Sequence, residues 1–342
     1  MKAEVTIGIP VYNSVDYIEQ TMLSALSQSF SDIEFLLVDD CGNDGTMEKL
    51  YNLKNTHPRG NAIRILHNPQ NKGVGYCRNK IIDEAQGRYL YFMDSDDYIE
   101  AETIEILYDA IQQNKCQIAY ASYDIIDLLD DNGKKEYVKE QSVFNHKDEL
   151  AYYAFKNMSV FHVSVCNSLV NLDFLRNSGA RFLNYQYWED MAYTYELVTK
   201  VESAVLLPSI TYHYLRRPGS LSHYQKRKIV KKEEIQNNII LIGTIKKKCL
   251  ELKDKSYTPY MCYNIEMVCF YMVCYILCHM EYVLPRFSNE ELRNILHHPL
   301  CLFDVVKFRE KKCSNVFMFF LGRVPAPLFV LIIRIMCKIK SV

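Results

Sequence analysis

The sequence predicts an α/β protein with a mostly parallel central sheet flanked by helices. Two observations predict this fold class. Short runs of β-branched and aromatic residues alternate with segments of helical periodicity over the first 126 residues, and acidic residues follow two of these runs directly. Alternating strands and helices build parallel sheets, which bind ligands beyond the carboxyl ends of their strands. The predicted strands are residues 5–10, 35–38, 63–67, 89–93 and 118–122.

Two amphipathic helices are predicted between these strands, because apolar residues recur every three or four positions. They contain Ile18, Met22 and Leu26 in the first, and Ile104, Leu107, Tyr108 and Ile111 in the second. A charged stretch with an Asn-Gly turn over residues 127–150 ends the alternation. Lys-rich and apolar helical periods follow from residue 225. We therefore expect three regions: 1–126, 127–224 and a mainly helical 225–342.

The composition is that of an ordinary globular protein. Of 342 residues, 49% are hydrophobic and 24% are charged, which excludes disordered, collagen-like and coiled-coil classes. The formal net charge of -1 argues against nucleic acid as a partner. The charge is unevenly distributed, since residues 1–150 carry a net charge of -12 and the remaining residues carry +11. The first part of the chain is acidic and the second part is basic.

Cysteine usage and the apolar segments predict a cytoplasmic location. The 12 cysteines include no C-x-x-C pair, which argues against a zinc ribbon or a dithiol redox motif. The N-terminus enters a predicted strand without the features of a secretory signal. The most apolar C-terminal run, residues 324–333, is shorter than the roughly 18 residues that span a bilayer. We expect no transmembrane helix.

Acidic residues follow the second predicted strand in the segment VDDCGNDGT. Asp40 lies at the strand end, where it would accept hydrogen bonds from a base or a ribose, as acidic residues do in nucleotide-binding folds. Asp44 is better explained as a cap of the following helix. The segment therefore predicts a nucleotide contact at Asp40.

Three carboxylates follow the fourth predicted strand in the segment DSDD. Asp94, Asp96 and Asp97 would repel one another unless a cation neutralised them. Oxygen ligands suit a hard divalent ion such as Mg²⁺ or Mn²⁺, which is usually shared with substrate phosphates. The alternative is a solvated acidic turn before the next helix. With Asp40 in the same sheet, we favour the metal site.

Two further segments carry candidate residues. In NPQNKGVGYCRN, Arg78 could face a phosphate or a base, although the segment could equally form only a turn and a salt bridge. In WEDM, Glu189 could simply cap a helix, whereas Asp190, close to the aromatic Trp188, could take a proton from an acceptor hydroxyl.

Basic residues follow a strand-like run in the segment YHYLRRPGSLSH. It contains His213, Arg216, Arg217 and His223. A guanidinium at this point could hold a departing diphosphate, because arginine forms paired hydrogen bonds with phosphate oxygens.

Five segments resemble glycosyltransferase family 2, the inverting nucleotide-sugar transferases with the GT-A fold. They are IPVYNSVDYIEQTMLSALSQSF, VDDCGNDGT, NKGVGYCRN, YLYFMDSDD and WEDM, in the family's order, and the resemblance covers about residues 3–224. It implies that Pro10 and Asp40 line the nucleoside pocket and that Asp190 is the catalytic base. It also implies a metal site for Mn²⁺ or Mg²⁺ at Asp96 and its neighbours.

The residues expected to act are therefore the following. Nucleotide contacts come from Pro10, Tyr12, Asp40, Arg78, Asp94 and Asp96, metal contacts from Asp96 and Asp97, and diphosphate or acceptor contacts from Trp188, Glu189, Arg216 and Arg217. Residues 1–126 would bind the nucleotide-sugar and residues 127–224 the acceptor.

The resemblance further implies a UDP-sugar donor and a saccharide or lipid-linked acceptor, in capsule, O-antigen or exopolysaccharide synthesis. The chemistry agrees, because a metal can stabilise a leaving diphosphate and an inverting transfer needs one base and no protein nucleophile. Processive members of the family carry a Gln-x-x-Arg-Trp motif and several membrane spans, and this chain lacks both. We expect one sugar to be added per encounter.

Two alternatives remain. A sugar nucleotidyltransferase would carry a Gly-rich loop with arginine after its first strand, but this chain has VYNSVDYIEQ there. A catalytically silent carbohydrate-binding protein could share the fold, although the intact DSDD and WEDM segments argue against it.

The C-terminal region is predicted to dock on the inner face of the membrane. Residues 216–255 contain 12 basic and 4 acidic residues, and the apolar tail carries Arg323, Arg334, Lys338 and Lys340. Basic residues beside an apolar surface favour anionic lipids, and a short apolar helix can lie in the interface. The alternative is a solvated helical face with a buried C-terminal helix, or an oligomer contact. Residues 261–284 contain charged residues and are predicted to form a buried helix.

Overall fold

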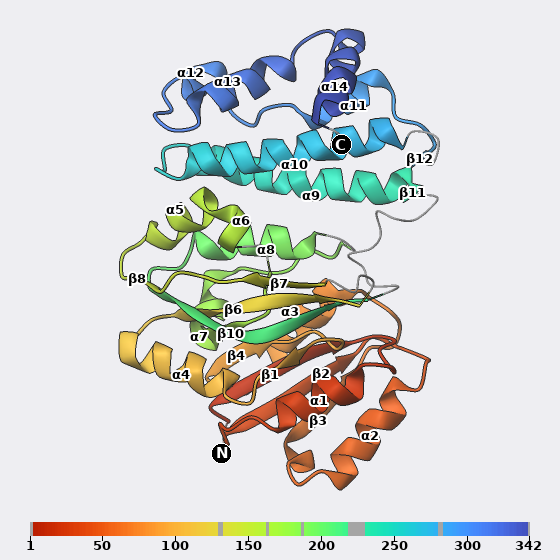
Figure 1. Cartoon of the computed structure of the whole chain (residues 1–342), viewed down its shortest axis with the longest axis vertical. Helices are drawn as coiled ribbons and strands as arrows, with labels where there is room; N and C mark the ends of the chain where they lie inside the picture. The colour runs from red at the N-terminus through yellow and green to blue at the C-terminus, as the bar shows by residue number, and fades with distance from the viewer. Residues whose placement is uncertain are drawn as a thin grey trace. The chain divides into compact units, whose positions relative to one another are not determined.

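The chain divides into two units, which comprise residues 1–150 with 159–222 (unit 1) and residues 151–158 with 223–342 (unit 2). The computed structural model describes residues 3–128, 133–161, 164–185, 188–217, 230–279 and 283–340 (Figure 1). Residues 218–229, which include His223, three basic residues of the segment 216–255 and the border predicted at residue 224, lie outside the described residues.

Unit 1 is built on one sheet, whose described strands follow the order β3-β2-β1-β4-β9-β6-β10-β5, with β7 beside β6 and β8 beside β10. Strands β3, β2, β1 and β4 pair in parallel, and β10 is parallel to β6. The strands are β1 (Val5–Val11), β2 (Ile33–Asp39), β3 (Ile63–His67), β4 (Tyr89–Phe92), β5 (Tyr98–Ile99), β6 (Ile118–Asp127), β7 (Lys134–Tyr137), β8 (Ser142–Phe144), β9 (Ser168–Asn171) and β10 (Ala204–Arg216).

The five predicted strands are confirmed as β1, β2, β3, β4 and β6. The second half of the sheet is mixed, because β9 runs antiparallel between β4 and β6, and β5 and β8 run antiparallel to β10. The border predicted after residue 126 falls inside β6, which pairs with β9 and β10 in the same sheet. The division into donor and acceptor regions stays a prediction.

Alternate residues of β1 face opposite layers of helices. Val5, Ile7 and Ile9 belong to the apolar core shared with α1 and α4. Gly8 lies against α3, and a Cβ built on it would lie 2.3 Å from Cγ2 of Ile81, so that only glycine allows this approach. The helical elements are α1 (Ile18–Leu26), α2 (Thr46–Thr56), η1 (Gly60–Ala62), α3 (Val74–Glu84), α4 (Thr103–Asn114), α7 (Leu172–Ser178) and α8 (Glu189–Val198).

Unit 2 is mainly helical, as predicted. Its two long helices α9 and α10 lie side by side (Figure 1) and are joined by a buried ion pair between Lys246 Nζ and Glu266 Oε1, 2.9 Å apart. The elements from residue 230 are β11 (Val230–Lys231), α9 (Lys232–Glu251), α10 (Thr258–Cys278), β12 (Val283–Leu284), α11 (Asn289–Ile295), α12 (Leu302–Val305), α13 (Lys312–Leu321) and α14 (Ala326–Lys340). Short helices α5 (Glu149–Lys156) and α6 (Met158–Phe161) precede β9 in the sequence.

Helix α10 occupies the segment predicted to be a buried helix. Among the described residues it is the one helix that is long and apolar enough to cross a membrane, by length and composition only. However, 61% of its apolar window is buried inside the molecule, and Glu266 near its middle is fully buried. These features are typical of a core helix.

Candidate active site

A cavity of about 1290 Å³ lies in unit 1, where β1, β2, β4 and β10 end. This is the edge of an α/β sheet at which ligands bind. Trp188 and Arg216 are not among the residues that line it. The predicted residues that do line it are Pro10, Tyr12, Asp40, Arg78, Asp94, Asp96, Asp97, Glu189, Asp190 and Arg217.

Asp40 shapes the loop in front of α3. Its Oδ1 accepts hydrogen bonds from Asn68 Nδ2 at 2.8 Å and from the amide of Lys72 at 2.9 Å, and its Oδ2 accepts one from the amide of Gly73 at 2.8 Å. Gly73 has φ of 87°, a conformation that favours glycine. Asp40 is only 3% exposed and also interacts with the Cys77 thiol, so the fold engages most of the roughly four acceptor positions of its carboxylate.

Arg78 lies at the centre of a buried ion-pair network. Its side chain is 3% exposed. Nη2 donates to Asp94 Oδ1 at 2.8 Å, while Nη1 donates to Glu189 Oε1 at 2.9 Å and to Asp190. Burial alone would lower the pKa of Arg78, but these three carboxylates raise it well above its usual range. The salt bridge named as the alternative at the sequence level is what the structure shows.

Helix α8 begins at the two carboxylates of this network. Gly75 in the first turn of α3 allows the close approach, because a Cβ there would lie 2.8 Å from the carbonyl oxygen of Leu183 and 3.6 Å from Glu189 Cγ. The side chain of Glu189 is 9% exposed and that of Asp190 is 28% exposed. Burial and the carboxylates of Glu189 and Asp94 raise the pKa of Asp190, although Arg78 opposes them. A carboxyl group with a raised pKa is suited to accepting a proton near neutral pH.

The three carboxylates after β4 have three different partners. Asp94 pairs with Arg78, and Asp96 Oδ2 accepts from Arg217 Nε at 2.7 Å. Asp97 is 1% exposed and accepts from the hydroxyl of Tyr212 and from the amide of Leu215, the latter at 2.8 Å. Burial and the two neighbouring carboxylates raise its pKa well above the usual range. Two arginines, Arg78 and Arg217, thus supply part of the neutralising charge that the sequence analysis assigns to a metal.

The fit of these residues to a divalent cation is partial. No group of three or more His, Cys, Asp or Glu side chains within the described ranges could hold a metal ion alone. Asp97 is 1% exposed and each of its oxygens already accepts a hydrogen bond inside the fold, so the predicted metal contact is less favoured at Asp97 than at Asp94 and Asp96. In contrast, the ion pairs engage only Oδ1 of Asp94 and Oδ2 of Asp96. One oxygen of each remains, and two carboxylates with substrate phosphates are a common magnesium ligand set.

Of the two arginines at the end of β10, only Arg217 lines the cavity. Arg217 lies over the ring of Tyr17 at 4.7 Å and lines the cavity. Arg216 instead pairs with Asp127 of β6 at 3.0 Å. Successive residues of an extended chain point to opposite sides, which explains why only one of the two reaches the cavity.

Sequence reasoning missed the tyrosine that organises the carboxylate turn. The Tyr212 hydroxyl donates to Asp97 Oδ2 and accepts from the amide of Asp94 at 3.2 Å. Tyr212 directly follows an irregularity in the pairing of β10 with β6 and lies more than a hundred residues from its partners, and no local pattern marks it. The neighbouring His213 bonds to Asp124 and Glu100, both at 2.8 Å, and is not a lining residue.

Comparison with known proteins supports an enzymatic role for this cavity. The family described as "Glycosyl transferase family 2" matches residues 6–178. A Bacillus subtilis protein named for teichuronic acid biosynthesis, TuaG, is 34% identical over 125 residues, which are 36% of this chain and 48% of that protein. This chain therefore matches about half the length of that relative.

A second relative is covered more completely. The Escherichia coli UDP-Glc:alpha-D-GlcNAc-diphosphoundecaprenol beta-1,3-glucosyltransferase WfaP is 27% identical over 237 residues, 69% of this chain and 86% of that protein. Among solved structures, residues 1–349 of S. aureus TarS with UDP-GlcNAc superimpose with a TM-score of 0.65 at 17% identity, covering 96% of this chain and 89% of that one. This likeness confirms the predicted fold class.

Proposed function

Because this chain belongs to glycosyltransferase family 2, we propose that it transfers one sugar at a time from a UDP-sugar, with inversion, to a saccharide or lipid-linked acceptor. The observation that carries the proposal is the meeting of Asp40, Asp94, Asp96 and Asp190 in one cavity at the ends of the strands. Such a cavity offers groups for a nucleoside, for a diphosphate and for an acceptor hydroxyl.

The proposed reaction uses a single base. The acceptor oxygen forms a bond to the anomeric carbon while the bond from that carbon to the diphosphate oxygen breaks, and the hydroxyl proton passes to Asp190. Arg78 holds Asp190 through Nη1 and so fixes the carboxylate that receives the proton. Arg217, which lines the same cavity, is suited to pairing with the negative charge that develops on the diphosphate.

We propose Asp94 and Asp96 as the residues that hold a divalent cation, Mn²⁺ or Mg²⁺, together with the diphosphate. When bound, such a cation stabilises charge on the leaving oxygens. Asp97 is assigned a positioning role, since it ties the turn after β4 to Tyr212 and Leu215 of β10.

The proposed product belongs to a cell-surface polymer such as a capsule, an O-antigen or an exopolysaccharide. The printed names of the two relatives support this class, since one refers to teichuronic acid and the other to an acceptor on diphosphoundecaprenol. A lipid-linked acceptor requires the enzyme to work at a membrane surface. We therefore propose a cytoplasmic protein that is peripheral on the inner membrane.

The apolar surface of α13 and α14 supports this location. Helix α14 buries Phe329 and Ile333, and its exposed side carries apolar side chains beside the exposed Arg334. Side chains about half exposed on the two helices are Phe317, Phe320, Leu328, Leu331 and Ile335. Exposed apolar groups of this kind mark protein or membrane contacts. We call these five residues the apolar surface.

The basic segment contributes less than the sequence suggested. Several described lysines of α9 and the following turn have acidic partners within unit 2: Lys232 pairs with Glu291, Lys246 with Glu266, Lys248 with Glu251 and Lys253 with Asp304. The docking proposal therefore shifts from this segment to α13 and α14.

A panel of nucleotide-sugars tests the proposed function. The purified chain with Mn²⁺ should release UDP from at least one UDP-sugar, with water or an added acceptor taking the sugar. Formation of pyrophosphate from UTP and a sugar 1-phosphate would instead identify a nucleotidyltransferase. Saccharide binding without turnover of any nucleotide-sugar would identify the silent binding protein.

A further inference from the structure

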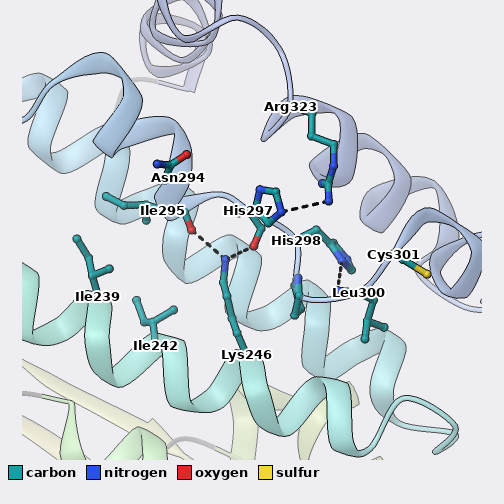
Figure 2. Close-up of a pocket in the computed structure, with 12 residues that line it drawn as sticks. Ile239, Ile242, Lys246, Asn294, Ile295, His297, His298, Leu300, Cys301 and Arg323 are labelled. Atoms are coloured by element: carbon teal, nitrogen blue, oxygen red, sulfur yellow. Dashed lines mark hydrogen bonds between the residues drawn. The ribbon is translucent and has the colours of Figure 1, made fainter.

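Unit 2 contains a second cavity, of about 440 Å³, between α9, the end of α11 and the turn before α14 (Figure 2). Its polar lining consists of Lys246, Asn294, His297, His298 and Arg323, along with Cys301. None of the described residues that line it is acidic. Figure 2 shows Lys246 and Arg323 reaching the loop around His297 from opposite sides.

The ammonium group of Lys246 is held by groups of the fold. Its Nζ contacts Glu266 Oε1 at 2.9 Å and donates to the carbonyl oxygens of Ile295 at 2.9 Å and His297 at 2.7 Å. An ammonium group has three protons: two are donated to these carbonyl oxygens, and the charge is paired with the buried carboxylate of Glu266. Lys246 therefore supports the floor of the cavity and holds the loop that follows α11.

Arg323 differs from Lys246, because contacts with the fold hold its guanidinium in place but involve only some of its N–H groups. It stacks over the ring of Phe319 at 3.5 Å, Nη1 donates to the Phe319 carbonyl at 3.0 Å, and Nη2 contacts His297 Nε2 at 3.3 Å. A guanidinium has five N–H groups, so about three remain for a ligand. No carboxylate of the described residues lies within ion-pair distance of Arg323.

The positive charge in this cavity is not balanced by Glu266. Burial, Arg323 and Lys246 together lower the pKa of His297. Burial lowers the pKa of His298 to about 4, and both cations add to the effect although Asn315 and Leu300 oppose it. Two cations, Lys246 and Arg323, thus face a single carboxylate, Glu266, and an anion would be stabilised beside the remaining positive charge.

Two features suggest which anion enters. The cavity also has an apolar lining, from Ile239, Ile242, Ile295 and Leu300. In the sequence, Arg323 lies between α13 and α14, so it is flanked by Phe320 and Leu328 of the apolar surface. A cation next to exposed apolar side chains matches a bilayer interface, where phosphates lie beside glycerol and acyl groups.

We propose that this cavity binds the phosphate of an anionic phospholipid headgroup when the apolar surface rests on the membrane. Arg323 supplies the charged hydrogen bonds, and His297 fixes the guanidinium that makes them. The inference rests on the docking part of the proposed function and gives it a specific lipid contact. It is independent of the donor chemistry in unit 1.

Vesicle sedimentation at fixed ionic strength tests this site. The probes are vesicles of equal parts phosphatidylglycerol and phosphatidylcholine, and vesicles of phosphatidylcholine alone. The variant is Arg323→Gln, and the matched control is Arg334→Gln, an exposed arginine of α14 that does not line the cavity. Arg323→Gln should weaken binding to the anionic vesicles by more than tenfold, whereas Arg334→Gln should weaken it about fivefold, the effect of one surface charge.

If the two substitutions weaken vesicle binding equally, the binding depends on overall charge, and the proposed phosphate site at Arg323 is wrong. Inorganic phosphate distinguishes a lipid headgroup from a soluble phosphate. The cavity binds a soluble phosphate instead of a lipid if two results are found together. Phosphate would raise the melting temperature of the wild type but not that of Arg323→Gln, and both proteins would bind vesicles equally. Arg323→Lys, which keeps the charge but loses the planar fork, serves if Arg323→Gln does not fold. UDP release by each variant should equal that of the wild type.

Discussion

The acidic first part and the basic second part of the chain handle their charge in opposite ways. In unit 1, Arg78 and Arg217 neutralise part of a carboxylate cluster, which leaves one oxygen each on Asp94 and Asp96. In unit 2, the buried Glu266 neutralises Lys246, which leaves Arg323 as a cation with unused donors. Charge counted along a sequence therefore overstates what a ligand can meet, and buried ion pairs decide which charges remain.

The largest effect that this comparison predicts is on stability, at Arg78. Arg78→Met removes the cation shared by three carboxylates, and breaking a buried ion pair from one side typically costs about 3–5 kcal/mol. Urea unfolding would measure the loss. The control is Arg181→Met, whose exposed pair with Asp83 should contribute less than about 1 kcal/mol. Equal losses in the two variants would show that the network around Arg78 is not a stabilising element.

The next effect concerns the proposed base. Asp190→Asn should lose turnover by at least about 10²-fold, which is the scale of one general base. Its affinity for UDP should be unchanged, because a base for the acceptor hydroxyl does not contact the nucleotide. Calorimetry of UDP binding and an assay of UDP release would separate the two steps. Turnover near that of the wild type would move the base to another residue.

A smaller effect is expected at the buried pair of unit 2. Glu266→Gln should destabilise the chain by about 1–3 kcal/mol, less than Arg78→Met, since Lys246 keeps two carbonyl acceptors. The control is Lys253→Gln, because the more exposed pair of Lys253 and Asp304 should contribute little. Urea unfolding of the wild type, Glu266→Gln and Lys253→Gln would measure their free energies of unfolding. An equal loss of stability in the two variants would contradict the prediction.

The same pair gives a prediction with pH. Burial raises the pKa of Glu266 above its ordinary value of 4.5, so the folded chain binds this proton more tightly than the unfolded chain does. Its contribution to stability is therefore greatest below that value and falls as the pH rises through the range above it. The stability of the wild type relative to Glu266→Gln should increase as the pH is lowered from 7 toward 5. No change, or a decrease, would show that Glu266 is not a carboxyl group of raised pKa.

The sequence predicted the parts of the site that follow from local pattern. A strand followed by acidic residues is visible in the sequence, and parallel pairing of β1, β2 and β4 then brings Asp40 and Asp94 to one edge of the sheet. Partners across the fold were not predictable. Tyr212 meets Asp97 across more than a hundred residues, and so Asp97 was assigned to a metal although its oxygens serve the fold.

The partners of Arg78 were likewise not predictable from the sequence. The place of Arg78 near the start of a helix was predictable, but its three partners come from two separate segments, after β4 and at the start of α8. Sequence pattern left open whether it meets a phosphate or forms a salt bridge; the structure shows the salt bridges, and a nucleotide contact of Arg78 stays a prediction. In α14, likewise, the apolar pattern was visible, but which side chains stay exposed depends on packing within unit 2.

The most direct test of the central claim is calorimetric titration of UDP into the wild type, Asp96→Asn and Asp97→Asn, each with and without Mn²⁺. Arg217 pairs with only one oxygen of Asp96, whereas each oxygen of the buried Asp97 accepts a hydrogen bond inside the fold. Mn²⁺ should strengthen UDP binding to the wild type and to Asp97→Asn, and this gain should fall by about tenfold or more in Asp96→Asn. Absence of UDP binding to the wild type, or an unchanged gain from Mn²⁺ in Asp96→Asn, would contradict the account.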